Sequence, residues 1–277
     1  MNPLDRQLAQ ALEQRYGETV GVPPDLPGLD DLLRIAAQTS HRRWAQTPVP
    51  PELTRLLAAC ALAAPTKSYL QQADIIDVRD AGKRAALAAL TPGMPWLADA
   101  PVLLVFCANG RRFKRLFERA GVPFTNDHLD GFFNPTVDAS LVMMNFMNAA
   151  GAVGLVGCAI SMLRNQAERL AQILELPQRV VPVAGLCLGY PAAQARAHPV
   201  INPRLALGAT FHTDRIGDVD DDAATDAFDA RYIAARAAQS GGSAPARAWS
   251  AERVHQYATP QRDGWGRFVR AQGFDLR

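Results

Sequence analysis

The sequence has 277 residues, of which 48% are hydrophobic and 20% are charged. A chain of this length and balance can bury a sizeable core, and it is typical of globular proteins rather than disordered or fibrous ones. The formal net charge is only +2, and Lys and Arg are scattered along the chain. This distribution offers no field for a polyanion, so nucleic acid is not an expected partner.

The predicted elements begin with a helix over 29–37 and a second over 53–64, where PVPPE supplies a helix start. Two strands are expected next, at 74–79 (DIIDVR) and at 102–108 (VLLVFCA), the latter a continuous apolar run typical of a buried strand. Residues 136–151 are apolar nearly all round, which predicts a helix that runs through the core.

The second half of the chain continues with a helix over 166–174 and a third strand over 180–190, closed by GYP. The sequence is loop-rich after residue 192, and three weaker helical patterns follow at 224–238, 250–257 and 264–272. SGGSAPA predicts a flexible loop between the first two of these patterns. We therefore expect an α+β fold, with a single domain over 1–277 in which 192–277 form a C-terminal extension.

The cysteines and the N-terminus indicate the compartment. All four cysteines lie within apolar runs and none forms a CxxC pair, which predicts buried thiols rather than disulfides or a zinc site. The first residues, MNPLDRQLAQALEQRYGE, contain no apolar segment of the kind found in signal peptides, and no apolar run is long enough to span a bilayer. A cytoplasmic protein without membrane contact is expected. The cysteines are Cys60, Cys107, Cys158 and Cys187.

Two motifs suggest binding sites but fit them poorly. GAVGLVG at 151–157 resembles a dinucleotide-binding turn, but it follows a helical pattern instead of a strand, so close backbone packing is the favoured interpretation. Asp218, Asp220 and Asp222 have the spacing of calcium ligands, but Ala223 stands where the calcium loop requires glycine. An acidic turn before a helix is favoured there.

No other pattern supplies reactive groups. The five histidines form no HExxH spacing, and no GxSxG nucleophile motif occurs. The residues therefore predict no metal site and no catalytic side chain. Redox chemistry, if present, would come from a bound cofactor.

Four segments occur in the order and approximate spacing of the FMN-dependent nitroreductase family: QTSHRRWAQTPVP, APTKSYLQQADIIDV, VDASLVMMNFMNAAGAVGLVGC and LPQRVVPVAGLCLGYP. The sequence resembles this family over roughly residues 30–277. It is most similar to the branch of oxygen-insensitive NADPH nitroreductases and NADPH-flavin oxidoreductases. The resemblance implies an α+β nitroreductase-like fold with a mostly antiparallel central sheet.

The resemblance assigns the first segment to the phosphate and ribityl chain of FMN. The matching positions are Gln38, Thr39, Ser40 and Arg42. Ser40 and Arg42 fit the family pattern, because a guanidinium offers paired, charge-assisted donors to a phosphate. Gln38 and Thr39 depart from the pattern, since they form hydrogen bonds but carry no charge.

Further residues carry over in the same way. Thr66 and Gln71 occupy the loop that meets the flavin ring in the family, and Gly157 lies where the backbone approaches that ring. His198 stands where relatives place a lysine near the phosphate, and Val200 stands where they place an arginine.

Three more sets of residues complete the comparison. The ribose phosphate of NADPH needs a basic fork, and the nearest arginines to the family position are Arg236 and Arg247, which flank SGGSAPA. Asp138 and Asn145 match family positions but receive no chemical role here. The loop from 112 to 135 is expected to influence acceptor preference.

The implied protein is an interlocked homodimer with FMN at the subunit interface, where each site takes residues from both chains. NADPH would reduce the flavin, and a small-molecule acceptor such as a nitroaromatic, a quinone or a free flavin would reoxidise it.

Two alternatives stay open. One is a flavoenzyme of the same fold with altered chemistry, such as dehalogenation or ring or azo reduction. The other is a non-catalytic flavin-binding module, which the uncharged Gln38, Thr39 and Val200 keep in view.

Overall fold

The computed structural model describes residues 3–193, 201–240 and 247–277. The chain divides into two compact units, and each is described by itself. One contains residues 40–197 and 262–277, called the sheet unit here, and the other contains residues 1–39 and 198–261, called the helical unit. The prediction of one domain with an extension from residue 192 stays a prediction.

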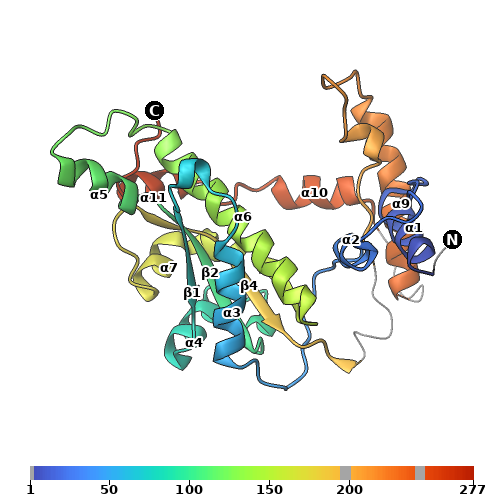
Figure 1. Cartoon of the computed structure of the whole chain (residues 1–277), viewed down its shortest axis with the longest axis horizontal. Helices are drawn as coiled ribbons and strands as arrows, with labels where there is room; N and C mark the ends of the chain where they lie inside the picture. Colours follow the sequence, from blue (N-terminus) through green and yellow to red (C-terminus); the bar gives the residue numbers. More distant parts are fainter. Residues whose placement is uncertain (1–2, 194–200, 241–246) are drawn as a thin grey trace. The chain divides into compact units, whose positions relative to one another are not determined.

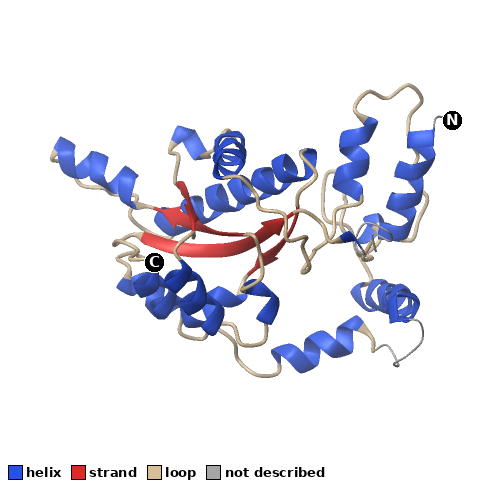
Figure 2. Ribbon diagram, turned by 90° about the horizontal axis from the view of Figure 1, so that it is seen from below, coloured by secondary structure: helices blue, strands red, loops and turns tan. Residues whose placement is uncertain are grey.

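The sheet unit is built on four antiparallel strands in the order β1-β2-β4-β3 (Figures 1 and 2). All residues of the two central strands are buried, which is why both appear in the sequence as continuous apolar runs. The antiparallel sheet confirms the α+β class. The strands are β1 (Ala73–Asp77), β2 (Val102–Asn109), β3 (Val156–Ile160) and β4 (Val180–Gly189).

Helices cover both faces of the sheet, because successive side chains of β2 point to opposite sides. Leu104 and Phe106 pack on one side against α3 (Pro51–Leu62), α6 (Asp130–Ala152) and α11 (Trp265–Ala271). Leu103 and Val105 pack on the other side with α4 (Ala81–Ala89) and α7 (Ala167–Ile173). Short 3₁₀ turns occur at Lys67–Tyr69, Pro95–Leu97 and Met162–Gln166.

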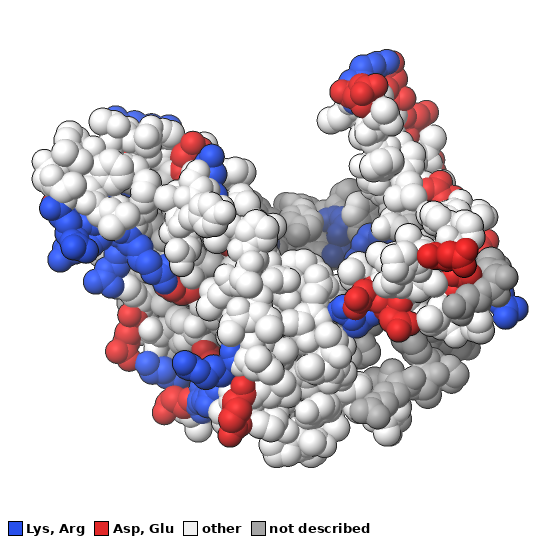
Figure 3. Space-filling model, viewed as in Figure 1, with Lys and Arg blue, Asp and Glu red and all other residues white. Residues whose placement is uncertain are grey.

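The helix predicted to run through the core, α6, has one buried face and one exposed stripe in the described structure. Its buried face carries Ala139, Val142 and Phe146 at helical spacing. A second apolar stripe, at Phe133, Val137, Leu141 and Met144, is 38–57% exposed. Figure 3 shows that the surface over α6 is almost free of charged side chains. The sequence indicated the apolar character correctly, but among the described residues the second stripe stays exposed.

The helical unit contains α1 (Pro3–Tyr16), α2 (Leu29–Ala36), α9 (Asp221–Ser240) and α10 (Trp249–Tyr257), with a 3₁₀ turn at Leu207–Ala209. The buried Arg15 guanidinium donates to the carbonyl oxygens of Ala36, Gln38 and Asn202 at 2.6–3.1 Å. Asp220 accepts the Ala223 N–H at 2.9 Å and so caps α9. This confirms the acidic turn before a helix that was favoured over a calcium loop.

Two expectations need correction, and one strand was missed. Cys60 is exposed, unlike the other cysteines, because it lies on the outward face of α3 between the buried Leu57 and Ala61. The segment 112–135 is not a continuous loop, since α5 (Arg111–Ala120) and the start of α6 lie in it. Strand β3 was not predicted at all. SGGSAPA lies almost entirely outside the described residues.

Two features are absent from the described parts of the chain. None of the described helices is long and apolar enough to cross a membrane. Within the same residues, no group of three or more His, Cys, Asp or Glu side chains is placed to hold a metal ion.

Candidate functional site

The segment with Ser40 and Arg42 is fixed to strand β3. The His41 N–H donates to the Gly157 carbonyl oxygen at 3.0 Å, and the Trp44 indole Nε1–H donates to the Val156 carbonyl oxygen at 3.1 Å. Trp44 also forms an isolated antiparallel bridge to Pro191. Ser40, Arg42 and Gly157 therefore lie together, and they are called the β3-side group below.

Gly157 is required by packing within the sheet. A Cβ atom at this position would lie 2.7 Å from the carbonyl oxygen of Cys187 on β4. Neither backbone can yield easily, so any side chain would displace β3. This contact supports the packing interpretation of GAVGLVG.

Arg42 is an exposed cation in aromatic surroundings. Its guanidinium lies 5.7 Å from the centre of the Trp96 ring, which itself packs against Trp44 with ring centroids 6.0 Å apart. Within the described residues, no carboxylate forms an ion pair with Arg42. A cation without a protein counter-charge fits a phosphate group.

Two neighbours of Arg42, Cys158 and Trp96, were not recognised as site residues from the sequence. Burial raises the pKa of the Cys158 thiol, while the Arg42 charge and hydrogen bonds with Ser40 and Arg42 oppose this rise. Trp96 was also missed; its signal in the sequence is a tryptophan within the Pro- and Gly-containing turn TPGMPWLADA. Burial lowers the pKa of His41, which therefore favours the neutral ring.

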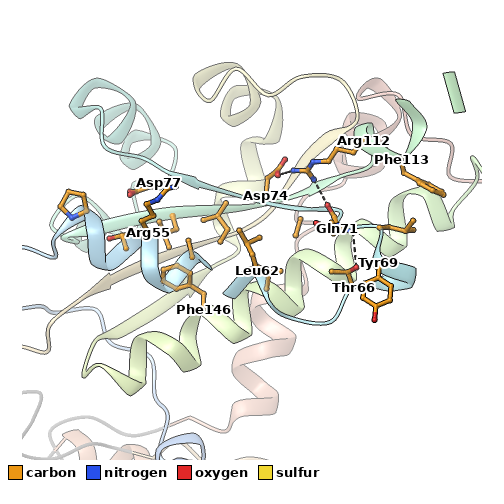
Figure 4. A pocket seen from close by; sticks show the side chains of 18 of the residues that line it. Arg55, Leu62, Thr66, Tyr69, Gln71, Asp74, Asp77, Arg112, Phe113 and Phe146 are labelled. Atoms are coloured by element: carbon orange, nitrogen blue, oxygen red, sulfur yellow. Dashed lines mark hydrogen bonds and ion pairs between the residues drawn. The ribbon is translucent and has the colours of Figure 1, made fainter. Parts of the chain in front are cut away.

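Thr66 and Gln71 lie in the connection between α3 and β1, called the 66–72 loop (Figure 4). The Gln71 N–H donates to the Thr66 hydroxyl at 3.3 Å, and Arg112 of α5 donates to the Gln71 carbonyl oxygen at 2.7 Å. Arg112 also forms an ion pair with Asp74. The Asn109 N–H closes the end of the loop by donating to the Gln72 carbonyl oxygen at 2.7 Å.

A pocket of about 990 Å³ opens beside this loop, between α3, β1 and α5. Figure 4 shows Thr66, Tyr69 and Gln71 at one end of it and Arg55 with Asp77 at the other. Apolar side chains, including Leu104, Val142 and Phe146, contribute to its walls. Tyr69 is 91% exposed beside it. An apolar wall with polar groups at the ends suits a flat, partly polar ligand.

The β3-side group and the 66–72 loop lie at opposite corners of the sheet in one chain. The loop leads into Ala73, which is in register with Ala108 and, through it, with Val181 of β4. Gly157 is in register with Leu188, seven residues further along β4. Ala73 and Gly157 are thus three strand spacings and seven residues apart, or about 27 Å by standard strand geometry. A flavin ring is far shorter than this distance.

The remaining predicted residues lie in the helical unit or outside the described residues. Gln38 and Thr39 end the first segment of the helical unit, and the Gln38 carbonyl oxygen is taken by Arg15. Arg236 is exposed on α9. His198 and Val200 fall outside the described residues.

The family model named nitroreductase family matches residues 35–190, and the model of its C-terminal domain matches residues 202–277. The chain belongs to the nitroreductase family. This family member is 31% identical over 187 residues to the oxygen-insensitive NADPH nitroreductase of Salmonella typhimurium, covering 68% of this chain and 75% of that protein. It is 31% identical over 178 residues to the NADPH-flavin oxidoreductase of Vibrio harveyi, covering 64% of this chain and 71% of that protein.

Solved nitroreductase structures match the fold closely. The structure of NfrA2 from B. megaterium superposes with a TM-score of 0.83 at 26% identity, over 90% of this chain and 99% of that one. YcnD from Bacillus subtilis gives the same TM-score at 25% identity. The nitroreductase-like fold implied by the sequence is confirmed.

Proposed function

We propose that the chain is an NAD(P)H-dependent FMN oxidoreductase that acts as a homodimer, with each flavin site built from the β3-side group of one copy and the 66–72 loop of the other. The single observation that carries this composite site is the separation of about 27 Å between the two groups within one chain. Both groups are proposed to meet the same ring, so they must come from different copies.

The uncovered face of α6 supports the second copy. Phe133, Val137, Leu141 and Met144 form one continuous stripe, and Leu56 and Cys60 of α3 are exposed as well. A two-fold dimer would bury the same patch on both copies. Large exposed apolar patches of this kind often mark surfaces at which proteins associate.

Each group has a proposed task toward FMN. Arg42 and Ser40 bind the phosphate, and Gln38 and Thr39 add uncharged hydrogen bonds to it. Thr66 and Gln71 hold the ring edge, and Gly157 lets the backbone approach it. His198 is proposed to lie near the phosphate. When bound, FMN supplies the electron transfer between NADPH and the acceptor.

The proposed role of the protein side chains is to orient the flavin ring, and none of them is proposed to act as a reactive group. Hydrogen bonds from the 66–72 loop orient the ring, and the apolar pocket walls reduce access of water to it. The proposed acceptors are nitroaromatics, quinones and free flavins, and the proposed location is the cytoplasm. Altered chemistry on the same flavin, such as dehalogenation or azo reduction, is the alternative class of reaction.

Absorbance spectra and initial rates test this function. The purified protein should carry a flavin spectrum that NADPH bleaches, and rate plots at several acceptor concentrations should be parallel, because donor and acceptor use the same site in turn. Intersecting lines, or activity in flavin-free protein, would contradict the proposal. A protein whose flavin NADPH does not bleach would be a binding module.

Arg236 is proposed to recognise the ribose phosphate of NADPH. The Arg236→Ala variant should raise the Michaelis constant for NADPH by roughly ten- to a hundred-fold, since a hydrogen bond to a charged group contributes about 1.5–3 kcal/mol. The constant for NADH should stay unchanged because NADH lacks that phosphate. Arg119→Ala, which removes an exposed arginine of α5, serves as the control. An equal effect on both nucleotides would exclude Arg236 from this role.

A further inference from the structure

The side of α6 that faces α3 and the sheet carries two polar side chains among apolar ones. Asp138 and Asn145 are seven residues apart, which places them two turns apart on the same side of the helix. Asp138 contacts the chain between α3 and β1, and Asn145 contacts the last turn of α3. Asn145 Nδ2 donates to the carbonyl oxygens of Cys60 and Ala61, at 3.0 and 3.4 Å, where α3 ends.

Asp138 holds the 66–72 loop at two points. Its side chain is fully buried, at 0% exposure. Oδ1 accepts the backbone N–H of Lys67 at 3.0 Å, and Oδ2 accepts the backbone N–H of Gln72 at 3.2 Å. One carboxylate therefore fixes the distance between the beginning and the end of the loop.

Burial of a carboxyl group is costly unless its oxygens are hydrogen-bonded. Within the described residues no cationic side chain forms an ion pair with Asp138. The compensation comes from the two backbone donors, and each such bond to a charged group contributes about 1.5–3 kcal/mol. Only an acceptor with two oxygens satisfies both ends of the loop.

The chain between these two points is strained. Ser68, Tyr69 and Gln71 have φ angles of 49°, 57° and 52°, in the left-handed region that favours glycine. Non-glycine residues in this region cost of order 1–3 kcal/mol each and persist only where surrounding contacts enforce them. Such residues concentrate at ligand-binding segments.

We propose that Asp138 is a positioning residue that keeps the 66–72 loop in its strained conformation and thereby sets the geometry with which Thr66 and Gln71 meet the flavin ring. The last part rests on the proposed function. Asp138 lies beneath the loop and contacts its backbone, so it acts through the loop and does not touch the flavin.

The test uses Asp138→Asn, which keeps the shape but turns one oxygen into an NH₂ group that faces a backbone N–H. Amide hydrogen exchange is measured in flavin-free protein. We expect exchange across 67–72 to accelerate roughly ten- to a hundred-fold, the equivalent of one hydrogen bond to a charged group. Exchange in β2 should not change. The control is Asn145→Ala, on the same helix, which should leave exchange at Lys67 and Gln72 as in the unaltered protein.

A second readout is the dissociation constant of FMN, measured by flavin fluorescence, which should rise at least about ten-fold in Asp138→Asn. Asp138→Glu keeps the charge but changes the reach, and it should also weaken FMN. Unchanged loop exchange, or equal acceleration in β2, would overturn the positioning role. Faster loop exchange with unchanged FMN affinity would overturn the link to the flavin. If the unaltered protein binds no FMN, the proposed function fails, while the exchange result still decides the role of Asp138 in the loop.

Discussion

Two inactive variants of this chain are expected to recover activity when they are combined in one dimer. Arg42→Glu replaces the proposed phosphate cation by an anion. Thr66→Glu places a carboxylate beside the proposed ring site and removes the acceptor for the Gln71 N–H. Each variant alone should lose activity by roughly a hundred-fold or more, since each introduces a negative charge where a part of the flavin is proposed to bind.

The recovery follows from the composite site. In a heterodimer, one site receives both substitutions and the other receives neither, so one of the two sites is intact. Heterodimers purified through two different affinity tags should therefore show about half of the unaltered activity per dimer. If the β3-side group and the 66–72 loop of one site came from the same copy, every site of this heterodimer would carry one defect. Activity would then not recover.

Pairing Arg42→Glu with Ser40→Glu provides the control. Both substitutions lie in the β3-side group, so every site of that heterodimer carries one defect and activity should stay low. Recovery in this control pair, or no recovery in the first pair, would show that the proposed assignment of residues to the two copies is wrong.

The second large effect is expected at the exposed stripe of α6. Leu141 is 43% exposed at the middle of this stripe. Leu141→Asp would bury one unpaired carboxylate per copy at a two-fold interface, at about 3 kcal/mol or more each. The dissociation constant of the dimer should rise by roughly 10⁴-fold. Analytical ultracentrifugation should detect monomers, and FMN should be lost with the partner copy.

Val122→Asp is the matched control for that variant. Val122 is 51% exposed in the loop after α5, outside the stripe, so the added charge should leave the dimer and the flavin in place. A dimeric Leu141→Asp variant that keeps its flavin would mean that the second copy does not cover α6.

The fold could be predicted where local pattern and burial agree. Strands β2 and β4 are long apolar runs, and α3 and α7 have clear helical periodicity, so all four were found. Strand β3 has only five residues, and Gly157 within it reads as a turn signal. Helix α5 has no buried residue. It is supported by ring contacts of Phe113 and Phe117 with Phe124, at 5.3 and 4.7 Å, which no local pattern reveals.

The candidate site shows the same limit in another form. Family resemblance named Arg42, Gly157, Thr66 and Gln71, but no spacing in the sequence reveals that they occupy opposite corners of the sheet. That separation depends on the register of β1 through β4, which only long-range pairing fixes. Asp138 could be seen as a lone acid in an apolar helix. Its two backbone partners, Lys67 and Gln72, lie about seventy residues earlier in the sequence, as the separations of 71 and 66 residues show.

Strand β1 has a further consequence for the behaviour of the protein in solution. It lies at the edge of the sheet, where unpaired backbone groups can recruit strands from other molecules. Its sequence, ADIID, carries two acidic side chains, and charged residues on an edge strand oppose such pairing. These side chains are Asp74 and Asp77, each in an ion pair with an arginine. Asp74 and Asp77 also line the pocket, so the same side chains shape the pocket and oppose aggregation. Substitutions made there to change ligand preference are expected to lower the solubility of the protein.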